Sequence, residues 1–443
     1  MIIMIDEPTI GFIFLLILIA LIILRFPISI ALITCGIAGT VTLSDWQPVL
    51  SQLKTLAFYR FSSFELSIIP LFILMGQFAQ KAELSSILFK SFNAWFGHKK
   101  GGLAIATIAS CAGFGAINGS SIATASSMSQ IALPEMRNNN YSNSISTGSL
   151  AAGGTLGILI PPSVVLVIYA IIAEQNITYM FAAAFIPGLL AVLGYILTVY
   201  IYVRVRPNSA TIEEKKNISE RLIALKNLIP LFLIFLIVIG GIYSGIFIPT
   251  EAASIGTALT FLMALFFKKL NFVKFKDSIL QTAKLSGMIF LILLGADIFN
   301  SFLGRSMLPQ ELGEFITSLG LPPIGILILI LIIYLILGLF LESLSMVLLT
   351  IPIFFPILMS QDFGMSPTET AIWFGVIILI VVELGLITPP FGLNLFVIHS
   401  IASDIKISQI FVGVIPFIFS DLIRIVIIII FPTTSLILVR MIN

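Results

Sequence analysis

The chain has 443 residues, of which 58% are hydrophobic and only 10% are charged, and its mean hydropathy is +1.14. Because a soluble domain averages about 25% charged residues, most of this chain must lie in lipid, with room for roughly ten spans of about 20 residues. The formal net charge of +2 gives no indication of nucleic-acid binding, and Cys35 and Cys111 lie in apolar stretches that exclude a disulfide framework.

The chain divides at one place. The only long polar stretch, RVRPNSATIEEKKNISERLIALK at 204–226, separates two apolar halves. We therefore expect a first unit over 8–205, a linker over 206–227 and a second unit over 228–440. The first apolar run, at 10–24, follows acidic rather than basic residues, so we interpret it as a retained span and not as a cleaved signal peptide.

The first unit is expected to contain two closely spaced spans over 8–43, a further span around 72–76 and then an apolar pair of segments over about 101–136. The centre of that pair is polar and reads GFGAINGSSIAT at 113–124. Each apolar arm is too short to cross about 30 Å alone, so we predict a re-entrant hairpin. In the alternative interpretation the small residues only allow close helix packing, for which Asn118 is a poor choice.

A proline-broken helix follows the hairpin. It is expected over about 141–173, with IPPS at 160–163 as the interruption, and a last span over about 179–205 completes the first unit. Broken helices expose backbone polar groups, which is costly in lipid unless those groups line a cavity or bind a ligand. The interruption therefore marks a candidate transport site.

The second unit repeats this order. Two spans over 228–267 and one around 291–295 precede a second predicted hairpin over about 322–360, whose centre reads GLFLESLS at 338–345. Here too the alternative is that small residues only serve packing, although a carboxylate at this depth, Glu342, is costly in lipid.

The second broken helix is expected over about 370–401 and is interrupted by TPPF at 388–391, which lies 228 residues after IPPS. A last span is expected over about 408–440. Two Gly- or Pro-interrupted apolar segments at corresponding positions in two halves are the best sequence indication of a transporter binding site.

Charge placement orients these elements. If the N-terminus is outside and the hairpins do not cross, most basic residues fall inside: Arg25, Lys99, Lys100, Arg137, the stretch 204–226, Lys268, Lys269, Lys274, Lys276 and Lys406. Many acidic residues fall outside: Asp6, Glu7, Asp45, Glu174, Glu251, Glu311, Glu314, Asp362 and Glu369. This follows the positive-inside rule, with Lys54, Arg60 and Arg305 as exceptions. We predict an all-α polytopic membrane protein of two inverted repeats, with a cytoplasmic linker, as alternating-access carriers use.

The tips and breaks indicate the chemistry. Unwound helices supply carbonyl oxygens for sodium, and helix N-termini with hydroxyls suit an anion, so we predict two sodium sites, one per half, with an anionic substrate between them. The predicted sodium-binding residues are Gly115, Asn118, Gly119, Ser120, Gly153, Gly154, Thr155, Gly338, Ser343, Gly385 and Thr388. The predicted substrate-binding residues are Ser121, Thr124, Glu342, Ser345, Pro389 and Asn394. Sodium is expected only as a coupling ion, and no cofactor is expected.

Two acidic positions have competing interpretations, and a third has one expected partner. Glu342 either faces the transport cavity or reaches water from the hairpin surface. Glu383, two residues before Gly385, is either a proton site or, as we favour, a structural hydrogen-bonding residue. Asp421 and Arg424 lie three apart in the last span and are expected to neutralise each other on one helix face.

The strings GAINGSSIATASSMSQIALPEM, IPPSVVLVIYA, SGIFIPTEAA and ELGLITPPFGLNLFV resemble the large membrane subunit of tripartite ATP-independent periplasmic (TRAP) transporters. The resemblance runs from about 8 to 435. It implies a sodium-driven elevator importer of organic acids in the bacterial inner membrane, with a periplasmic N-terminus on our charge assignment. It also implies a small four-helix membrane subunit and a soluble periplasmic substrate-binding protein. Where that family usually has an Asp-Pro-Thr-like string in the second hairpin, this chain has Glu342-Ser343-Leu344.

Two other functional classes are weighed against this one. A self-sufficient sodium-coupled anion symporter of related fold would need no binding protein. A membrane-embedded enzyme is disfavoured, because no Ser/His/Asp, Cys/His or HExxH constellation occurs, and His98 and His399 are the only histidines. The sequence also has no GxxxxGK[ST] phosphate loop, which disfavours ATP hydrolysis as the energy source.

Overall fold

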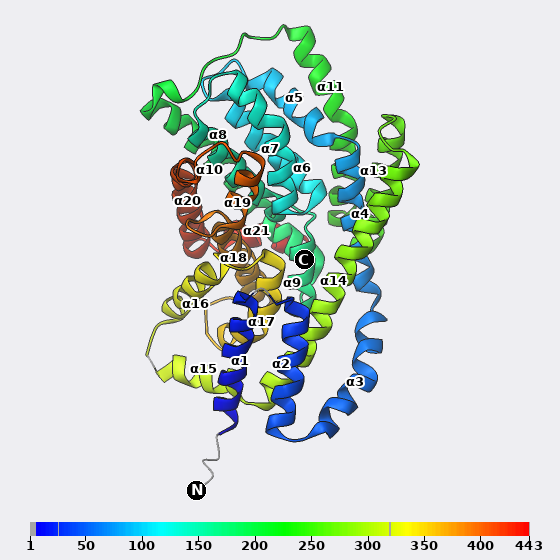
Figure 1. Cartoon of the computed structure of the whole chain (residues 1–443), viewed down its shortest axis with the longest axis vertical. Helices are drawn as coiled ribbons and strands as arrows, with labels where there is room; N and C mark the ends of the chain where they lie inside the picture. The colour runs from blue at the N-terminus through cyan, green and yellow to red at the C-terminus, as the bar shows by residue number, and fades with distance from the viewer. Residues whose placement is uncertain (1–5, 25, 319, 443) are drawn as a thin grey trace.

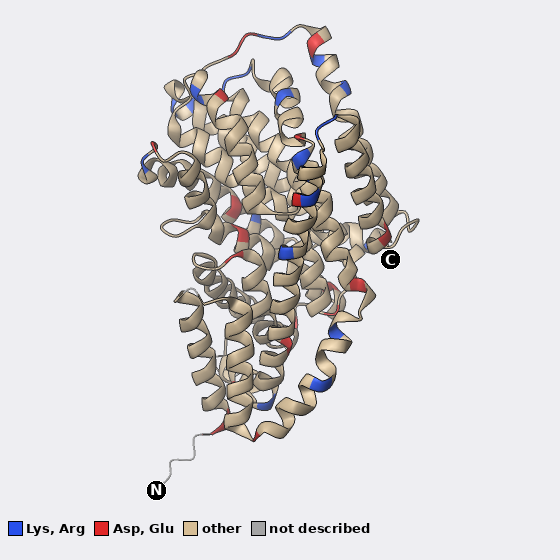
Figure 2. Cartoon of the chain, turned by 45° about the vertical axis from the view of Figure 1, so that its right-hand side comes forward, with Lys and Arg blue, Asp and Glu red and all other residues tan. Residues whose placement is uncertain are grey.

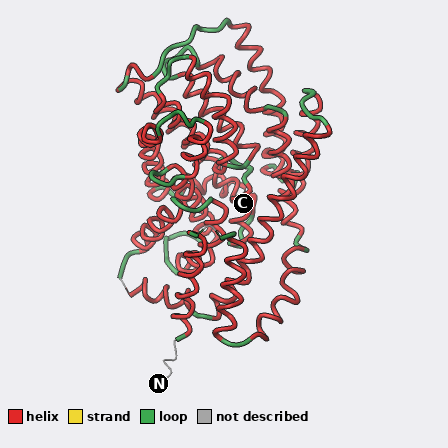
Figure 3. The backbone as a smooth tube through the Cα atoms, viewed as in Figure 1, coloured by secondary structure: helices red, strands yellow, loops and turns green. Residues whose placement is uncertain are grey.

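The computed structural model describes residues 6–24, 26–318 and 320–442, and these residues form helices without a strand (Figure 3). The prediction of an all-α membrane protein is confirmed: six of the described helices are long and apolar enough to span a bilayer, or eight if each of two bent pairs counts as one span. Arg25, one of the basic residues used above to orient the chain, lies outside the described residues.

The α-helices are α1 (Glu7–Ile23), α2 (Ile28–Leu43), α3 (Trp46–Phe61), α4 (Ile68–Lys81), α5 (Leu84–Phe96), α6 (Gly102–Asn118), α7 (Ser121–Asn138), α8 (Asn143–Leu159), α9 (Val164–Ile172), α10 (Ile177–Val205), α11 (Ile218–Phe235), α12 (Gly241–Tyr243), α13 (Pro249–Phe266), α14 (Phe272–Arg305), α15 (Leu308–Ser318), α16 (Pro323–Gly338), α17 (Ser343–Met359), α18 (Pro367–Ile387), α19 (Leu393–Ile401), α20 (Ile407–Ile430) and α21 (Thr433–Ile442). Short 3₁₀ turns occupy Phe64–Ser67 and Pro207–Ser209, and a π-helical turn at Leu236–Gly240 joins α11 to α12.

We use the name scaffold for α1–α4, α11, α13 and α14. Within it α14 packs on α2 and α4, and α13 packs on α4 (Figure 1). The α3–α4 pair is bent by 57°. The Arg60 guanidinium of α3 forms an ion pair with Asp297 of α14. This pairing accounts for one of the three exceptions to the positive-inside pattern, because the charge of Arg60 is neutralised by a neighbouring helix.

We use the name transport core for the two helix hairpins, α6–α7 and α16–α17, and the two broken helices, α8–α9 and α18–α19. α8 packs on α6 and α7, and α18 packs on α16 and α17. The packing is close enough that a Cβ on Gly115 would lie 2.5 Å from Cα of Gly157, and one on Gly385 would lie 2.7 Å from Cα of Gly338. Gly157 and Gly385 occupy corresponding places, two residues before the end of α8 and of α18.

In the transport core, helices from each half of the chain pack against a hairpin of the other half. α9, from the first half, packs on α17 of the second hairpin, while α19, from the second half, packs on α7 of the first hairpin. At the surface Arg137, near the end of α7, bonds to Asp404, just after α19, at 2.8 Å. The Arg137 guanidinium thereby lowers the pKa of Asp404 from its usual value. Each hairpin is therefore covered partly by a helix from the other half.

Helices α3, α5 and α15 lie outside the elements expected from the sequence, and two of the expected elements have other boundaries. The last ten residues of the expected linker belong to α11, because the Glu220 carboxylate accepts a hydrogen bond from the Asn217 N–H at 3.3 Å and caps the helix start. The expected last span over 408–440 is two helices, α20 and α21, since Pro432 cannot continue the hydrogen-bond ladder.

Basic residues are frequent at the end of the molecule that carries the α10–α11 connection, where acidic residues also occur, and both kinds occur toward the opposite end near α1 (Figure 2). The orientation of the chain in a membrane stays a prediction.

Candidate functional site

The first hairpin turns sharply at its tip. α6 ends at Asn118, Gly119 adopts φ +65°, and the Ser120 hydroxyl caps α7 by accepting a hydrogen bond from the Ala123 N–H at 3.4 Å. A Cβ on Gly119 would lie 3.4 Å from the carbonyl oxygen of Pro162. The tip of the first hairpin therefore lies directly against the break of the first broken helix, as the sequence pattern implied.

The second hairpin has a longer tip. α16 ends at Gly338 and α17 begins at Ser343, with Glu342 at the helix N-cap position. The Glu342 side chain is half-buried and does not cap the helix by a hydrogen bond. Ser345, in the first turn of α17, is buried. This arrangement leaves the Glu342 carboxylate available to other groups.

The two proline breaks differ in exposure. The first, Ile160 to Ser163, is buried throughout, whereas Pro389 is half-buried and Pro390 is exposed in the second. The Thr388 hydroxyl donates a hydrogen bond at 2.6 Å to the Leu384 carbonyl of its own helix. The exposed second break is thus the more accessible of the two.

A polar network at the centre of the transport core connects both hairpins. The Ser343 hydroxyl, at the first residue of α17, donates a hydrogen bond at 2.7 Å to Oε1 of Glu383, which is fully buried in α18. The Asn394 amide of α19 donates at 2.9 Å to the hydroxyl of Ser121, the first residue of α7. The hydrogen bond expected for Glu383 is therefore present, to Ser343, while the candidates Ser121 and Asn394 bond to each other.

Four polar atoms of these residues and their neighbours are buried without a hydrogen-bond partner among the described residues. They are Asn118 Nδ2, Thr124 Oγ1, Glu383 Oε2 and Asn394 Oδ1. Buried polar groups are normally satisfied, so an ion, water or substrate bound here would supply the missing partners. Three of the four are oxygen atoms that can accept from a donor or coordinate a cation.

The remaining candidates on α8 serve helix packing in this structure. A Cβ on Gly153 would lie 2.7 Å from Cys111 Sγ of α6, and one on Gly154 would lie 2.7 Å from the Ala125 side chain of α7. Thr155 projects elsewhere: its hydroxyl lies 3.0 Å from the Tyr195 hydroxyl of α10. Gly153 and Gly154 therefore lie at close helix contacts, and a Cβ on Gly154 would also lie 3.2 Å from Asn394 Nδ2. The structure does not bring the Thr155 hydroxyl to the hairpin tip, and sodium binding by these residues stays a prediction.

Tyr195 belongs to a second buried polar group that the sequence did not indicate. Its hydroxyl donates at 2.7 Å to Asp421 Oδ2 of α20, and Asp421 Oδ1 lies 2.7 Å from the Arg424 guanidinium. The expected pairing of Asp421 with Arg424 is present, as a charge contact rather than an aligned hydrogen bond. A tyrosine 40 residues away in sequence from Thr155 carried no local signal of this contact.

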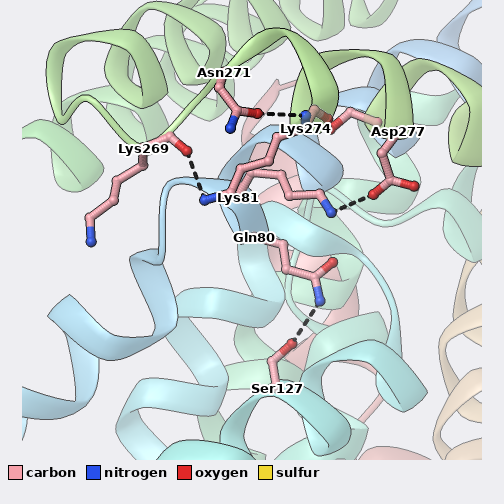
Figure 4. A network of polar contacts seen from close by, with 8 residues as sticks. Gln80, Lys81, Ser127, Lys269, Asn271, Lys274 and Asp277 are labelled. Carbon is pink, nitrogen blue, oxygen red and sulfur yellow. Dashed lines mark hydrogen bonds and ion pairs between the residues drawn. The ribbon is translucent and has the colours of Figure 1, made fainter.

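The scaffold touches the first hairpin through few polar contacts. The Gln80 amide of α4 donates to the Ser127 hydroxyl of α7 at 3.3 Å, while its neighbour Lys81 points toward Asp277 of α14 (Figure 4). One turn earlier in α4, Gly76 leaves room for Asn118: a Cβ there would lie 2.7 Å from Asn118 Oδ1. α4 therefore borders the first hairpin along its length and at its tip.

Comparisons with known proteins fit this architecture. The crystal structure of the Alcanivorax borkumensis YdaH transporter has a similar fold, with a TM-score of 0.61 at 15% identity, covering 87% of this chain and 89% of that chain. The "C4-dicarboxylate TRAP transporter large permease protein DctM" of Pseudomonas aeruginosa is 36% identical over 370 residues, which are 83% of this chain and 84% of that protein.

A relative named for a different substrate is similar over a comparable length. The "Sialic acid TRAP transporter large permease protein SiaM" of Vibrio cholerae is 30% identical over 382 residues, covering 85% of this chain and 86% of that protein. The family model described as "Tripartite ATP-independent periplasmic transporter, DctM component" matches residues 15–434. The chain therefore belongs to the family of large membrane permease subunits of TRAP transporters.

Proposed function

We propose that this chain is the permease subunit of a sodium-driven, binding-protein-dependent importer of a small organic acid. The observation that carries the proposal is that both hairpin tips bond to the second broken helix at buried polar groups: Ser343 bonds to Glu383 of α18, and Ser121 bonds to Asn394 of α19. This centre adjoins unpartnered oxygens of Thr124 and Asn394, which suit a cation or a substrate hydroxyl.

The charges at this centre give a physical reason for coupling to a cation. α7 and α17 direct their N-termini toward it, and helix N-termini attract carboxylates. The oxygens there that lack a hydrogen-bond partner among the described residues, Thr124 Oγ1, Glu383 Oε2 and Asn394 Oδ1, can coordinate a cation. A sodium ion bound to them would attract an organic anion held at these helix N-termini, and such attraction is strong where water is excluded.

The relatives support the class of substrate that we propose. Proteins named for C4-dicarboxylates and for sialic acid are both similar to this chain, and both kinds of substrate carry a carboxylate. We propose a small organic acid for this chain on that shared chemistry. The word tripartite in the family description supports two partners, which we take to be a small four-helix membrane subunit and a soluble periplasmic substrate-binding protein.

We further propose an elevator mechanism in the bacterial inner membrane. The transport core would move as a body against the scaffold, carrying the site across. The Gln80–Ser127 hydrogen bond and the Gly76–Asn118 contact belong to the boundary along which such a movement would occur. No covalent chemistry is assigned to the site, so the subunit is proposed to act as a carrier and not as an enzyme.

The proposal is tested with proteoliposomes that contain the permease, its small subunit and its loaded binding protein. Uptake of the organic acid should require an inward sodium gradient and no ATP. Replacing sodium by potassium at a fixed membrane potential should reduce uptake to background. Equal uptake in the two salts would contradict sodium coupling.

Two substitutions at the first tip test the ion site. Asn118→Ala and Ser120→Ala should each raise the sodium concentration for half-maximal uptake severalfold, because each removes a polar group at a tip that adjoins the first break. Thr155→Ala should have a smaller effect, since its hydroxyl faces Tyr195. Sodium titrations of reconstituted uptake measure this, and an unchanged sodium requirement in both tip variants would show that these residues only pack.

A further inference from the structure

We propose that the groove between α10 and α20 binds an anionic phospholipid, with the phosphate at Arg206 and one acyl chain along the groove. The groove has a volume of about 790 Å³, and none of the predicted sodium-binding or substrate-binding residues lines it. The inference goes beyond the proposed function, and it does not depend on which solute or ion the chain transports.

The walls of the groove are apolar side chains of two helices that pack on each other (Figure 1). Leu193, Leu197 and Ile201 of α10 line one wall, and each of these side chains is more than half exposed. Phe419 and Ile423 of α20 line the other wall and are exposed to a similar degree. Exposed apolar side chains in a spanning helix need an apolar cover, which an acyl chain provides.

The dimensions of the groove fit an acyl chain better than a helix of a partner protein. The lining residues of α10 run from Leu190 to Arg206, which is about 24 Å at 1.5 Å per residue. Over that length a volume of about 790 Å³ corresponds to a cross-section of roughly 33 Å², whereas a helix about 10 Å wide occupies roughly 80 Å². A chain that begins at Arg206 also stays within the groove, because the hydrocarbon of one leaflet is only about 15 Å thick.

The charge at one end of the groove favours an anion. Arg206 is exposed, lines the groove and belongs to none of the ion pairs among the described residues. Its guanidinium donates a hydrogen bond to the Tyr202 hydroxyl at 3.1 Å, which uses one of its five N–H donors. The other donors suit the oxygens of a phosphate, which arginine binds in a bidentate manner. Basic pockets between spanning helices bind anionic head groups in this way.

The far end of the groove does not compete for the phosphate. Arg424 lines the groove there, but its guanidinium is buried and lies 2.7 Å from the Asp421 carboxylate. Among the described residues that line the groove, none is acidic, so no lining carboxylate repels a phosphate. Arg206 directly follows α10, at the start of the polar connection to α11, where the head groups of a bilayer would lie. The head group is therefore assigned to the Arg206 end and the acyl chain to the apolar walls.

Lipid binding to the purified full chain in detergent tests the head-group site. Native mass spectrometry would follow binding of dioleoyl phosphatidylglycerol, which is anionic, and of dioleoyl phosphatidylcholine, which has the same chains and no net charge. The chain should bind the anionic lipid about fivefold more tightly, because one cation near a membrane surface contributes about that factor. Arg206→Gln should remove this preference, and Arg206→Lys should keep most of it.

Arg204→Gln is the matched control for the charge. It removes the same charge two residues away, but the Arg204 guanidinium lies 4.1 Å from the centre of the Tyr200 ring and does not line the groove. This variant should keep the preference of the wild type. A preference that survives Arg206→Gln, or equal binding of the two lipids by the wild type, would overturn the head-group site.

Leu197→Trp tests the acyl-chain part of the proposal. The larger ring would fill the groove, so binding of both lipids should weaken about tenfold. Leu233→Trp makes the same substitution at an exposed position of α11, outside the groove, and should bind both lipids like the wild type. Unchanged lipid binding in Leu197→Trp would overturn the acyl-chain site.

The same variant distinguishes a lipid from a partner protein. If Leu197→Trp releases the small membrane subunit from a co-purified complex and leaves lipid binding unchanged, the groove is an interface with that subunit and the proposal is overturned. Because no measurement here requires uptake, transport without sodium dependence would overturn the proposed function alone. Sodium-driven uptake by a chain that does not prefer the anionic lipid would overturn this inference alone.

Discussion

Proteoliposomes that contain only this chain should import organic acid no faster than protein-free liposomes, whereas the complete three-component system should import it readily. The polar centre of the transport core is buried, with Ser121, Ser343 and Glu383 almost inaccessible to solvent, so a dilute anion has no exposed site at which to be captured. Capture from dilute solution is the task we assign to the binding protein.

Radiolabelled uptake with single components omitted measures this requirement. Omission of the small subunit should be as damaging as omission of the binding protein, provided that the permease is reconstituted at equal density. If the chain alone matches the complete system, the self-sufficient symporter is the better description. That outcome would leave the sodium requirement as a separate question.

Glu342→Gln should lower uptake by at least about tenfold while membrane expression stays normal. The side chain is half-buried at the N-cap of α17 and precedes Ser343, which bonds to Glu383. A carboxylate at membrane depth costs roughly 2.5–3.5 kcal/mol on insertion scales, so a free one there is expected to contact a cation or substrate group. Glutamine keeps the shape and removes the charge.

Initial uptake rates and sodium titrations of the variant measure this effect. Glu135→Gln is the matched control, because it makes the same substitution on the exposed surface near the end of the first hairpin. The control should transport like the wild type. Wild-type kinetics in Glu342→Gln would assign that carboxylate to the hairpin surface and leave the hydroxyls of Ser343 and Ser345 as the better candidates.

The elements of the transport core were predictable because their signals are local. A double proline must interrupt a helix, and a glycine-bearing polar centre between short apolar arms favours a turn within the membrane. α8 indeed ends at Leu159 and α18 at Ile387, directly before the prolines. Ser121, Ser343 and Asn394 are predictable candidates for the same reason, because they are polar residues at these tips and breaks.

Contacts between distant elements were not predictable in this way. Nothing in the sequence around Thr155 indicates that its hydroxyl would lie within hydrogen-bond distance of the Tyr195 hydroxyl, because that contact depends on how α10 packs. Likewise, Gly153 and Gly154 look like an unwound segment in sequence but are helical, where they allow α6 and α7 to approach. Small residues serve both purposes, and only the three-dimensional packing distinguishes them.

The packing of helices from one half of the chain onto the hairpin of the other half has a consequence for biosynthesis. When α9 leaves the ribosome, its partner α17 has not been made, and α7 must similarly wait for α19. At about 5–20 residues per second, the interval is on the order of ten to thirty seconds for α9. During that time the newly inserted first hairpin and broken helix lack their covering helices. Lipid, the insertion machinery or a partner subunit must shield them, so the permease cannot mature one half at a time.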